Sequence, residues 1–287
     1  MAAEEQAPTS GEYIHHHLTH LSNIETAAPV DFHVVHWDSV FFSSLLGLVF
    51  LLLGLMAARR VTSGVPGRFQ AAFEFLIEMV DEQARGIVHN ATSRKMVAPL
   101  ALTVFIWIFL LNAMDLLPVD LLPWLFQHAS GNPEAHLRVV PTADISVTMG
   151  MSVAVLLCCI YYNLKIKGVG GWTHELVVAP FGTSRNPLFA VLLGVVNFAM
   201  QMIEFVAKTV SLGMRLYGNM YAGELIFLLI ALLGGAWTLS LGGIGLAILH
   251  IFSGTVWVLF HVIIITLQAF VFMMLTLVYI GQAHDAH

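Results

Sequence analysis

Five long runs of apolar residues, separated by shorter polar segments, dominate the chain. The runs cover Val40–Ala58, Met96–Leu117, Ile145–Leu164, Leu188–Leu233 and Ile244–Ile280. A helix needs about 20 residues to cross a bilayer, so each of the first three runs fits one crossing. The last two are too long for one perpendicular helix, so each is expected to be steeply tilted or broken into two pieces. The pattern predicts an all-α polytopic membrane protein.

Composition supports this class, because 58% of the 287 residues are hydrophobic and only 10% are charged. With a net charge of −6, the chain is not expected to have a nucleic-acid partner. Its only cysteines, Cys158 and Cys159, are neighbours within an apolar run, which indicates packing residues rather than a disulfide or metal ligands. We therefore expect no metal and no cofactor.

The distribution of basic residues predicts the orientation in the membrane. Residues 1–38 contain no Lys or Arg, and placing them outside leaves only Arg138 as a basic residue on the outer side. The cytoplasmic side then collects Arg59, Arg60, Arg68, Arg85, Arg94, Lys95, Lys165, Lys167 and Arg185. We expect residues 1–38 to form an extracytoplasmic tail and residues 39–287 a single integral-membrane domain with a cytoplasmic C-terminus. The acidic start, without a cleavable signal or an Arg-rich transit peptide, favours a bacterial inner membrane.

One segment, Val65–Val88, has a different pattern. Apolar residues recur there at helical spacing, and acids and an arginine occupy most other positions. The apolar positions are Phe69, Ala72, Phe73, Leu76, Ile77, Val80 and Ala84. This is typical of an amphipathic surface helix. It could lie on the cytoplasmic leaflet, dock on a partner subunit, or pack as a solvated helix against the rest of the chain.

The loop after the second run opens with a short proline-rich stretch, Asp115–Trp124, which carries Asp115 and Asp120. Trp124 follows as a plausible interfacial anchor. We expect both acids at the outer edge of the membrane, where water reaches them. They could be merely solvated, or they could belong to a path for protons.

An arginine inside an apolar run is the most informative single residue. From Pro187 to Gly281 the only Asp, Glu, Lys or Arg residues are Glu204, Lys208, Arg215 and Glu224. A guanidinium keeps its proton, and at a helix centre it costs about 2.5–3.5 kcal/mol on insertion scales. A chain that retains such a charge is expected to use it. We expect a carboxylate partner or water beside Arg215.

Polar residues of the last two runs match in depth if two antiparallel helices are aligned. Glu204, Lys208, Arg215 and Asn219 share one helical face, as do His250, Trp257, His261 and Gln268. Placing Arg215 level with Gln268 brings Glu224 near His261, and Glu204 near Tyr279. At 1.5 Å per residue, Glu224 and Glu204 lie about 14 and 16 Å from the arginine, on opposite sides. Titratable groups therefore flank a fixed cation, as expected of two access paths that stop at a barrier.

Three sequence words resemble subunit a of the F-type ATP synthase membrane sector. They are SLGMRLYGNMYAGE at Ser211–Glu224, FHVIIITLQAF at Phe260–Phe270 and NAMDLLPVDLLP at Asn112–Pro123. The resemblance extends from about Phe32 to the C-terminus. It implies one outer transmembrane helix, an amphipathic surface helix, a transmembrane hairpin and two long tilted helices facing a ring of c subunits. The implied partners are the c-subunit rotor ring, the b-subunit stalk, other ATP synthase subunits and membrane lipid.

The resemblance also implies roles for individual residues. Arg215 corresponds to the stator arginine of that family. Asn219, Glu224, His261 and Gln268 correspond to the lining of an outer half-channel, with Asp115 and Asp120 near its mouth. Glu204, Ser211 and Tyr279 are candidates for a cytoplasmic half-channel, and Lys208 lies near its exit. Tyr217 and Thr209 depart from the residues that many members carry, and the spacing from Glu204 to Arg215 is shorter than in some members.

The function implied is that of a non-catalytic stator subunit that carries protons to and from the ring carboxylate, coupling ion flow to rotation and ATP synthesis. The sequence leaves open whether the ion is H⁺ or Na⁺. A stand-alone secondary transporter or ion channel is the alternative, and it would predict internal repeats, which the two halves do not display. A purely structural scaffold would leave the matched depths of Arg215, Glu224, His261 and Gln268 without a reason.

Overall fold

The computed structural model describes residues 10–24, 33–62, 64–132, 136–235 and 240–284. Within these residues every regular element is a helix, and the only β-type pairing is one isolated bridge between Ser22 and His36. The elements are α1 (Ser10–Leu18), α2 (Trp37–Arg59), α3 (Arg68–Ile87), α4 (Ala91–Ala113), η1 (Met114–Leu116), α5 (Leu121–Ser130), η2 (Pro141–Ala143), α6 (Ile145–Val178), α7 (Pro187–Gly235), α8 (Leu241–Gly281) and η3 (Gln282–His284). The prediction of an all-α polytopic membrane protein is confirmed.

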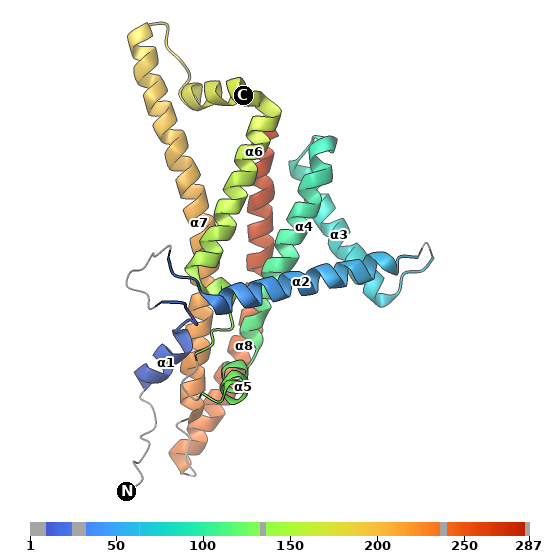
Figure 1. The fold of residues 1–287 in the computed structure, drawn as a ribbon, viewed down its shortest axis with the longest axis vertical. Helices are drawn as coiled ribbons and strands as arrows, with labels where there is room; N and C mark the ends of the chain where they lie inside the picture. The colour runs from blue at the N-terminus through green and yellow to red at the C-terminus, as the bar shows by residue number, and fades with distance from the viewer. Residues whose placement is uncertain (1–9, 25–32, 63, 133–135, 236–239, 285–287) are drawn as a thin grey trace. The chain divides into compact units, whose positions relative to one another are not determined.

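Five of the described helices, α2, α4, α6, α7 and α8, are long and apolar enough to cross a membrane. Each predicted apolar run falls largely within one of them. Helices α7 and α8 are continuous over 49 and 41 residues (Figure 1). At 1.5 Å per residue they are about 74 and 62 Å long, far more than the roughly 30 Å hydrocarbon core. Of the two predicted alternatives, a break into shorter pieces is not observed, which leaves steep tilt.

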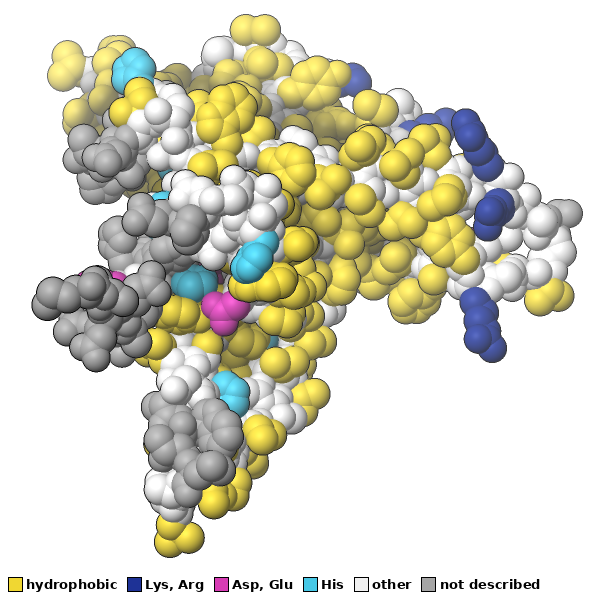
Figure 2. Space-filling model, turned by 60° about the horizontal axis from the view of Figure 1, so that its bottom comes forward, with side chains coloured by type: hydrophobic (Ala, Val, Ile, Leu, Met, Phe, Trp, Pro, Cys, Tyr) yellow, Lys and Arg dark blue, Asp and Glu magenta, His cyan; other side chains and the backbone are white. Residues whose placement is uncertain are grey.

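The surface of the protein is unusually apolar. Many large side chains on α2, α7 and α8 are exposed, among them Leu51, Val191 and Ile263. Hydrophobic side chains cover most of the described surface on the face shown in Figure 2. A soluble monomer rarely exposes such continuous apolar area, whereas lipid covers it without cost.

The chain divides into two compact units. The first unit comprises Met1–Leu55, Ile106–Asp144 and Tyr217–Ala269, and the second comprises Met56–Phe105, Ile145–Leu216 and Phe270–His287. Each unit thus combines segments far apart in the sequence. Both long helices contribute one part to each unit.

Two helices differ from the expected boundaries. The third apolar run ends at Leu164, close to a sharp kink of α6 at Gly168, where φ is +69°. Beyond the kink a second helical piece, which the apolar run does not predict, extends to Val178 (Figure 1). Lys167 Nζ lies 2.7 Å from Glu175 Oε1, so two charged residues beyond the apolar run neutralise each other in an ion pair. Helix α5 lies where a proline-rich loop was expected. Its Pro123 falls in the first helical turn, where proline is tolerated.

Helix α3 lies within the segment expected to be amphipathic. Its Val80 and Ala84 are buried, whereas Phe75 and Ile77 are exposed. Gly281, at the end of α8 in the same unit, lies so close to Ile87 that an added Cβ would be 2.7 Å from the isoleucine side chain. The helix therefore packs against its own unit with part of its apolar surface and leaves another part open.

Candidate functional site

A buried ion pair is the centre of the polar cluster in the first unit. Arg138 Nε and Nη2 donate to the two carboxylate oxygens of Glu224 on α7, at 3.3 and 2.5 Å. The side chains are only 6% and 9% exposed. Burial acts to lower the pKa of Arg138, but the charges of Glu224 and Asp144 outweigh it and raise that pKa above its ordinary value. Arg138 therefore remains charged, and it holds the Glu224 carboxyl group by a two-pronged hydrogen-bonded contact.

His261 on α8 lies against Asp115, with 2.6 Å between Nε2 and Oδ2, and both side chains are buried. This distance would allow an ion pair with a protonated imidazole, but the two atoms do not have the geometry of a hydrogen bond. Gly223 on α7 makes room for it, because a Cβ there would be 2.3 Å from the His261 ring and 3.1 Å from Asp115. The expectation of a water-exposed Asp115 is wrong, since η1 turns this side chain into the unit. The predicted depth match of His261 with Glu224 agrees with the close approach of His261 to Gly223, the residue before Glu224. The polar contact that His261 makes is with Asp115.

A small cavity adjoins these acids. It has a volume of about 30 Å³ and is lined by Asp115, Glu224 and His17 together with apolar residues. That volume is enough for a water molecule. Buried polar atoms without a protein hydrogen-bond partner occur in the same unit, including both amide atoms of Asn112 and Nδ1 of His261. Such atoms are normally hydrogen-bonded, so water is the expected partner.

Asp120 is exposed, as predicted, and two residues of the N-terminal tail contact it. Tyr13 Oη donates to Asp120 Oδ1 at 2.9 Å, and His17 Nε2 lies 3.0 Å from the same oxygen. Tyr13 and His17 are four residues apart and so share one face of α1. Burial and the neighbouring Asp120 raise the pKa of Tyr13.

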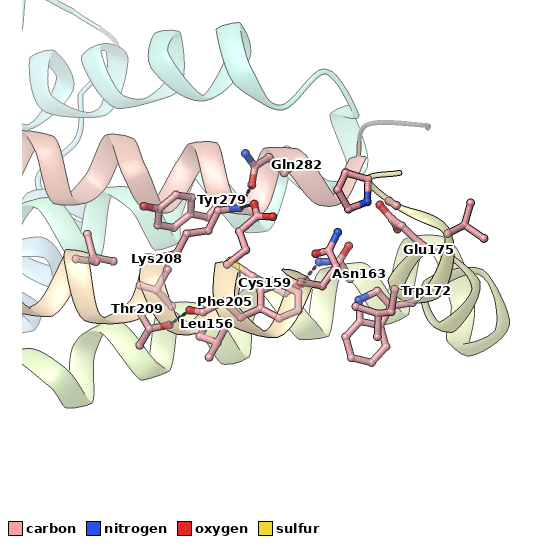
Figure 3. A pocket seen from close by; sticks show the side chains of 18 of the residues that line it. Leu156, Cys159, Asn163, Trp172, Glu175, Phe205, Lys208, Thr209, Tyr279 and Gln282 are labelled. Carbon is pink, nitrogen blue, oxygen red and sulfur yellow. Dashed lines mark hydrogen bonds and ion pairs between the residues drawn. The ribbon is translucent and has the colours of Figure 1, made fainter. Parts of the chain in front are cut away.

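The second unit contains a larger cavity of about 570 Å³ between α6, the first part of α7 and the end of α8 (Figure 3). Glu204 and Lys208 form an ion pair of 2.5 Å at its wall. Lys208 Nζ also donates to Gln282 at 2.7 Å and lies 5.3 Å from the ring centre of Tyr279. The predicted grouping of Glu204, Lys208 and Tyr279 is thus present. Further polar lining residues are Ser152, Asn163, Trp172, Glu175, Gln201 and Thr209.

Arg215 takes no part in the ion pairs of either cluster. Its side chain is exposed, and Nη2 donates to Ser211 at 3.5 Å. Glu204 and Glu224, the acids nearest to it along α7, pair with Lys208 and Arg138 instead. Among the described residues no carboxylate forms an ion pair with Arg215.

Ser211, Asn219 and Gln268 are among the predicted site residues that line neither cavity. Ser211 is exposed beside Arg215, Asn219 is half-buried, and Gln268 is buried in α8. Sequence reasoning missed Arg138 as a site residue and treated it only as an orientation signal. The available clue was that Arg138 is the sole basic residue on the predicted outer side, since an unbalanced buried acid such as Glu224 needs a cation.

Comparison with known proteins identifies the family. The family model "ATP synthase A chain" matches residues 40–281. Proteins named ATP synthase subunit a are similar over the full length of both chains, with 65% identity in Acidovorax sp. (strain JS42) over 287 residues and 63% in Paracidovorax citrulli (strain AAC00-1) over 292 residues. The protein of that name from Verminephrobacter eiseniae (strain EF01-2) is 60% identical over 287 residues. The chain therefore belongs to the ATP synthase A chain family, the proton-translocating subunits of the ATP synthase membrane sector.

Proposed function

We propose that this subunit moves protons through two separate half-channels that meet a rotating ring of c subunits, with Arg215 as the charge between them. One observation carries the proposal. Two polar clusters are built on the same helix, α7, on either side of Arg215 in the sequence, and each acid of α7 pairs with a cation other than Arg215. The arginine is thereby left exposed for a carboxylate of another subunit.

The outer half-channel is assigned to the first unit. A proton enters past Asp120 and His17, reaches the cavity between Asp115 and Glu224, and passes on by way of His261. His261 and the two acids can exchange protons, whereas Arg138 cannot and serves as their counter-charge. Asn219 and Gln268 continue the path towards the ring as polar side chains on α7 and α8.

The cytoplasmic half-channel is assigned to the cavity in the second unit. Its volume of about 570 Å³ accommodates many waters, so a proton released there needs no continuous chain of side chains. Glu204 is half-exposed beside Lys208, and Tyr279 contributes a hydroxyl. Ser211, although outside the cavity, is hydrogen-bonded to Arg215 and joins the arginine to this side.

Arg215 has two effects in this mechanism. Its positive field keeps a passing ring carboxylate ionised, because an opposite charge nearby favours the charged form. It also prevents a direct leak, since a guanidinium does not release its proton. Only a neutral carboxyl can turn into lipid, so each ring site must be protonated from the outer side before it rotates away.

The face of α7 that carries Arg215 fits a close-packed partner. Ser211, Arg215, Gly218 and Ala222 are exposed and spaced at helical intervals on one side of the helix. In the described part of the chain, apart from the two neighbours in sequence, no side chain lies within 4 Å of a Cβ built on Gly218. Small residues allow helices to approach closely in lipid, so we assign this face to the ring.

The subunit is not itself an enzyme in this proposal. One elementary charge crossing 100 mV releases only about 2.3 kcal/mol, so several translocations must accumulate as rotation before ATP forms on other subunits. The b-subunit stalk would hold this chain still against the ring. The proposed location is a bacterial inner membrane, with residues 1–38 outside and the C-terminus in the cytoplasm.

Arg215→Ala tests the central assignment. Inverted membrane vesicles carrying the assembled complex should lose ATP-driven acidification, with Arg60→Ala, which removes an exposed arginine elsewhere, as the matched control. Arg215→Lys should also fail largely, because an ammonium lacks the planar fork and can lose its proton. Pumping that persists in Arg215→Ala with intact assembly would make the arginine structural and contradict the proposal.

A further inference from the structure

A histidine of the N-terminal tail touches the buried ion pair of the first unit. His20 Nε2 lies 2.8 Å from Arg138 Nη1. A guanidinium has no acceptor, so it must donate, and His20 must accept at Nε2. His20 is therefore neutral here and carries its proton on Nδ1, which faces Asp38 Oδ2 at 3.3 Å. The ring thus links Asp38 to the arginine.

Arg138 divides its nitrogens between two partners. Nε and Nη2 hold Glu224, while Nη1 is bonded to His20. The guanidinium is planar and rigid, so the acceptor at Nη1 fixes the orientation of the whole group. It thereby sets the geometry of the two hydrogen bonds from Nε and Nη2 to the carboxylate. Without that acceptor Nη1 would lose its partner in a largely buried site, which favours rotation of the whole group.

The carboxylate of Asp38 holds both residues in register. It accepts hydrogen bonds from the backbone N–H groups of Leu21 at 3.0 Å, Ser39 at 2.8 Å and Arg138 at 3.2 Å. Leu21 follows His20 directly, so one buried acid fixes the tail and the arginine loop together. The position of the His20 ring is therefore built, not incidental to a loose tail.

Other charged groups surround the ring. His36 is stacked on His20 with 4.1 Å between ring centres, and its Nδ1 lies 2.7 Å from Asp144. The guanidinium carbon of Arg138 lies over the Tyr221 ring, 5.6 Å from the ring centre. His20, His36 and Asp144 are close enough to share a metal ion. However, His20 already uses Nε2 for a cation and Nδ1 for Asp38, so we do not assign a metal there.

We propose that His20 is a positioning residue of the outer half-channel, which acts through Arg138 to hold Glu224 as an ionised, ion-paired carboxylate until the proton arrives. This inference rests on the proposed role of Glu224. It gives the histidine-bearing tail a function beyond covering the membrane domain. Weakening the fork by removing the acceptor lets Glu224 take up its proton at higher outer pH.

Two substitutions of His20 distinguish the effect of its hydrogen-bond acceptor from the effect of its side-chain volume. His20→Gln keeps an acceptor for Arg138 and a donor for Asp38, whereas His20→Leu keeps volume and removes both. His128→Leu is the matched control, because His128 is an exposed histidine that bonds only to the backbone of its own helix in the structure. If His20→Leu does not assemble, His20→Met takes its place, since a thioether is only a weak acceptor.

The measurement uses the reconstituted whole complex. Initial rates of ATP synthesis are recorded against lumenal pH, the lumen being the outer side, at fixed pH difference and fixed potential. For His20→Leu we expect the midpoint to move by about one pH unit towards alkaline pH, the size expected for loss of one hydrogen bond to a charged group. His20→Gln should restore the wild-type midpoint, and His128→Leu should not move it.

A wild-type profile in an assembled His20→Leu complex would overturn the inference, and so would a His20→Gln profile that matches His20→Leu. Glu224→Gln separates this failure from failure of the proposed function. If Glu224→Gln keeps full synthesis, the outer path itself is wrongly assigned. If Glu224→Gln loses synthesis while His20→Leu behaves as wild type, only the role of His20 is wrong.

Discussion

At the scale of single residues, Arg138–Glu224 is the most buried ion pair involving Lys or Arg in the described part of the chain. Burial makes such a pair expensive to break, because removing one member leaves an uncompensated charge. It does not follow that the pair adds net stability, since two buried charges lose their hydration. The pair is better understood as a way to keep a protonatable acid inside the protein.

Arg138→Gln should therefore destabilise the subunit by roughly 3–5 kcal/mol, the cost of an unpaired buried charge. The double variant Arg138→Gln/Glu224→Gln should recover most of this stability while losing proton transport. Denaturant unfolding in detergent would measure the first effect, and vesicle acidification the second. Arg85→Gln is the control, because its pair with Asp81 is exposed and worth about 0.5 kcal/mol or less. Equal losses in Arg138→Gln and Arg85→Gln would contradict the assignment.

At the scale of helices, glycine positions determine how closely neighbours approach. Gly213 faces α6, where a Cβ would be 2.6 Å from Met149 Sδ, and Gly223 faces His261 and Asp115. Gly218 lies between them in sequence and meets open space. Gly213 and Gly223 thus serve packing within this chain, whereas Gly218 leaves room on the exposed face of α7.

Gly223→Ala should displace His261 from Asp115, because the added methyl group would overlap the buried imidazole unless the α7 backbone or the ring moves. We expect at least about a tenfold loss of ATP-driven pumping, comparable to a helix–helix contact worth about 1.4 kcal/mol. Gly54→Ala is the matched control, since a Cβ there meets nothing within 4 Å. It should be neutral, or stabilising by up to about 1 kcal/mol. Wild-type pumping in Gly223→Ala would show that the ring has room to move and that the contact does not matter.

At the scale of the whole molecule, the charge distribution predicts the topology. The N-terminal tail is bound by Asp38 and Asp120 in the first unit, so the tail and these acids belong to one side of the membrane. Nine basic residues are expected on the other side, which the positive-inside rule places in the cytoplasm.

Single cysteines test this topology in a background lacking Cys158 and Cys159. A membrane-impermeant maleimide should label Gly11→Cys in right-side-out vesicles and Thr183→Cys only in inverted ones, because both positions are exposed and lie at opposite ends of the predicted crossings. Three of the five candidate membrane-spanning helices, α2, α4 and α6, lie between the two positions in sequence. An odd number of crossings places the two sites on opposite sides. Labelling of both from the same side would contradict the proposed orientation.

Local pattern was sufficient for the helices and for the candidate residues on them. Apolar runs and their lengths predicted α2, α4, α7 and α8, since burial in lipid depends on each segment by itself. The continuation of α6 past Lys167 was missed, because it depends on an ion pair with Glu175 and on a glycine kink. Helix α5 was missed because prolines suggested a loop, although a proline in the first helical turn is compatible with a helix.

The sequence by itself determined the all-helical membrane class, the family and the set of polar residues on α7 and α8, because each follows from composition, helical spacing or a local motif. Only the tertiary structure decided the partners of those residues. Glu224 pairs with Arg138 and Asp115 with His261, and the tail reaches both Asp120 and Arg138. These contacts join positions about a hundred residues apart, and no local preference encodes them. They arise from the way packed helices and a short connecting loop bring opposite charges together where water is scarce.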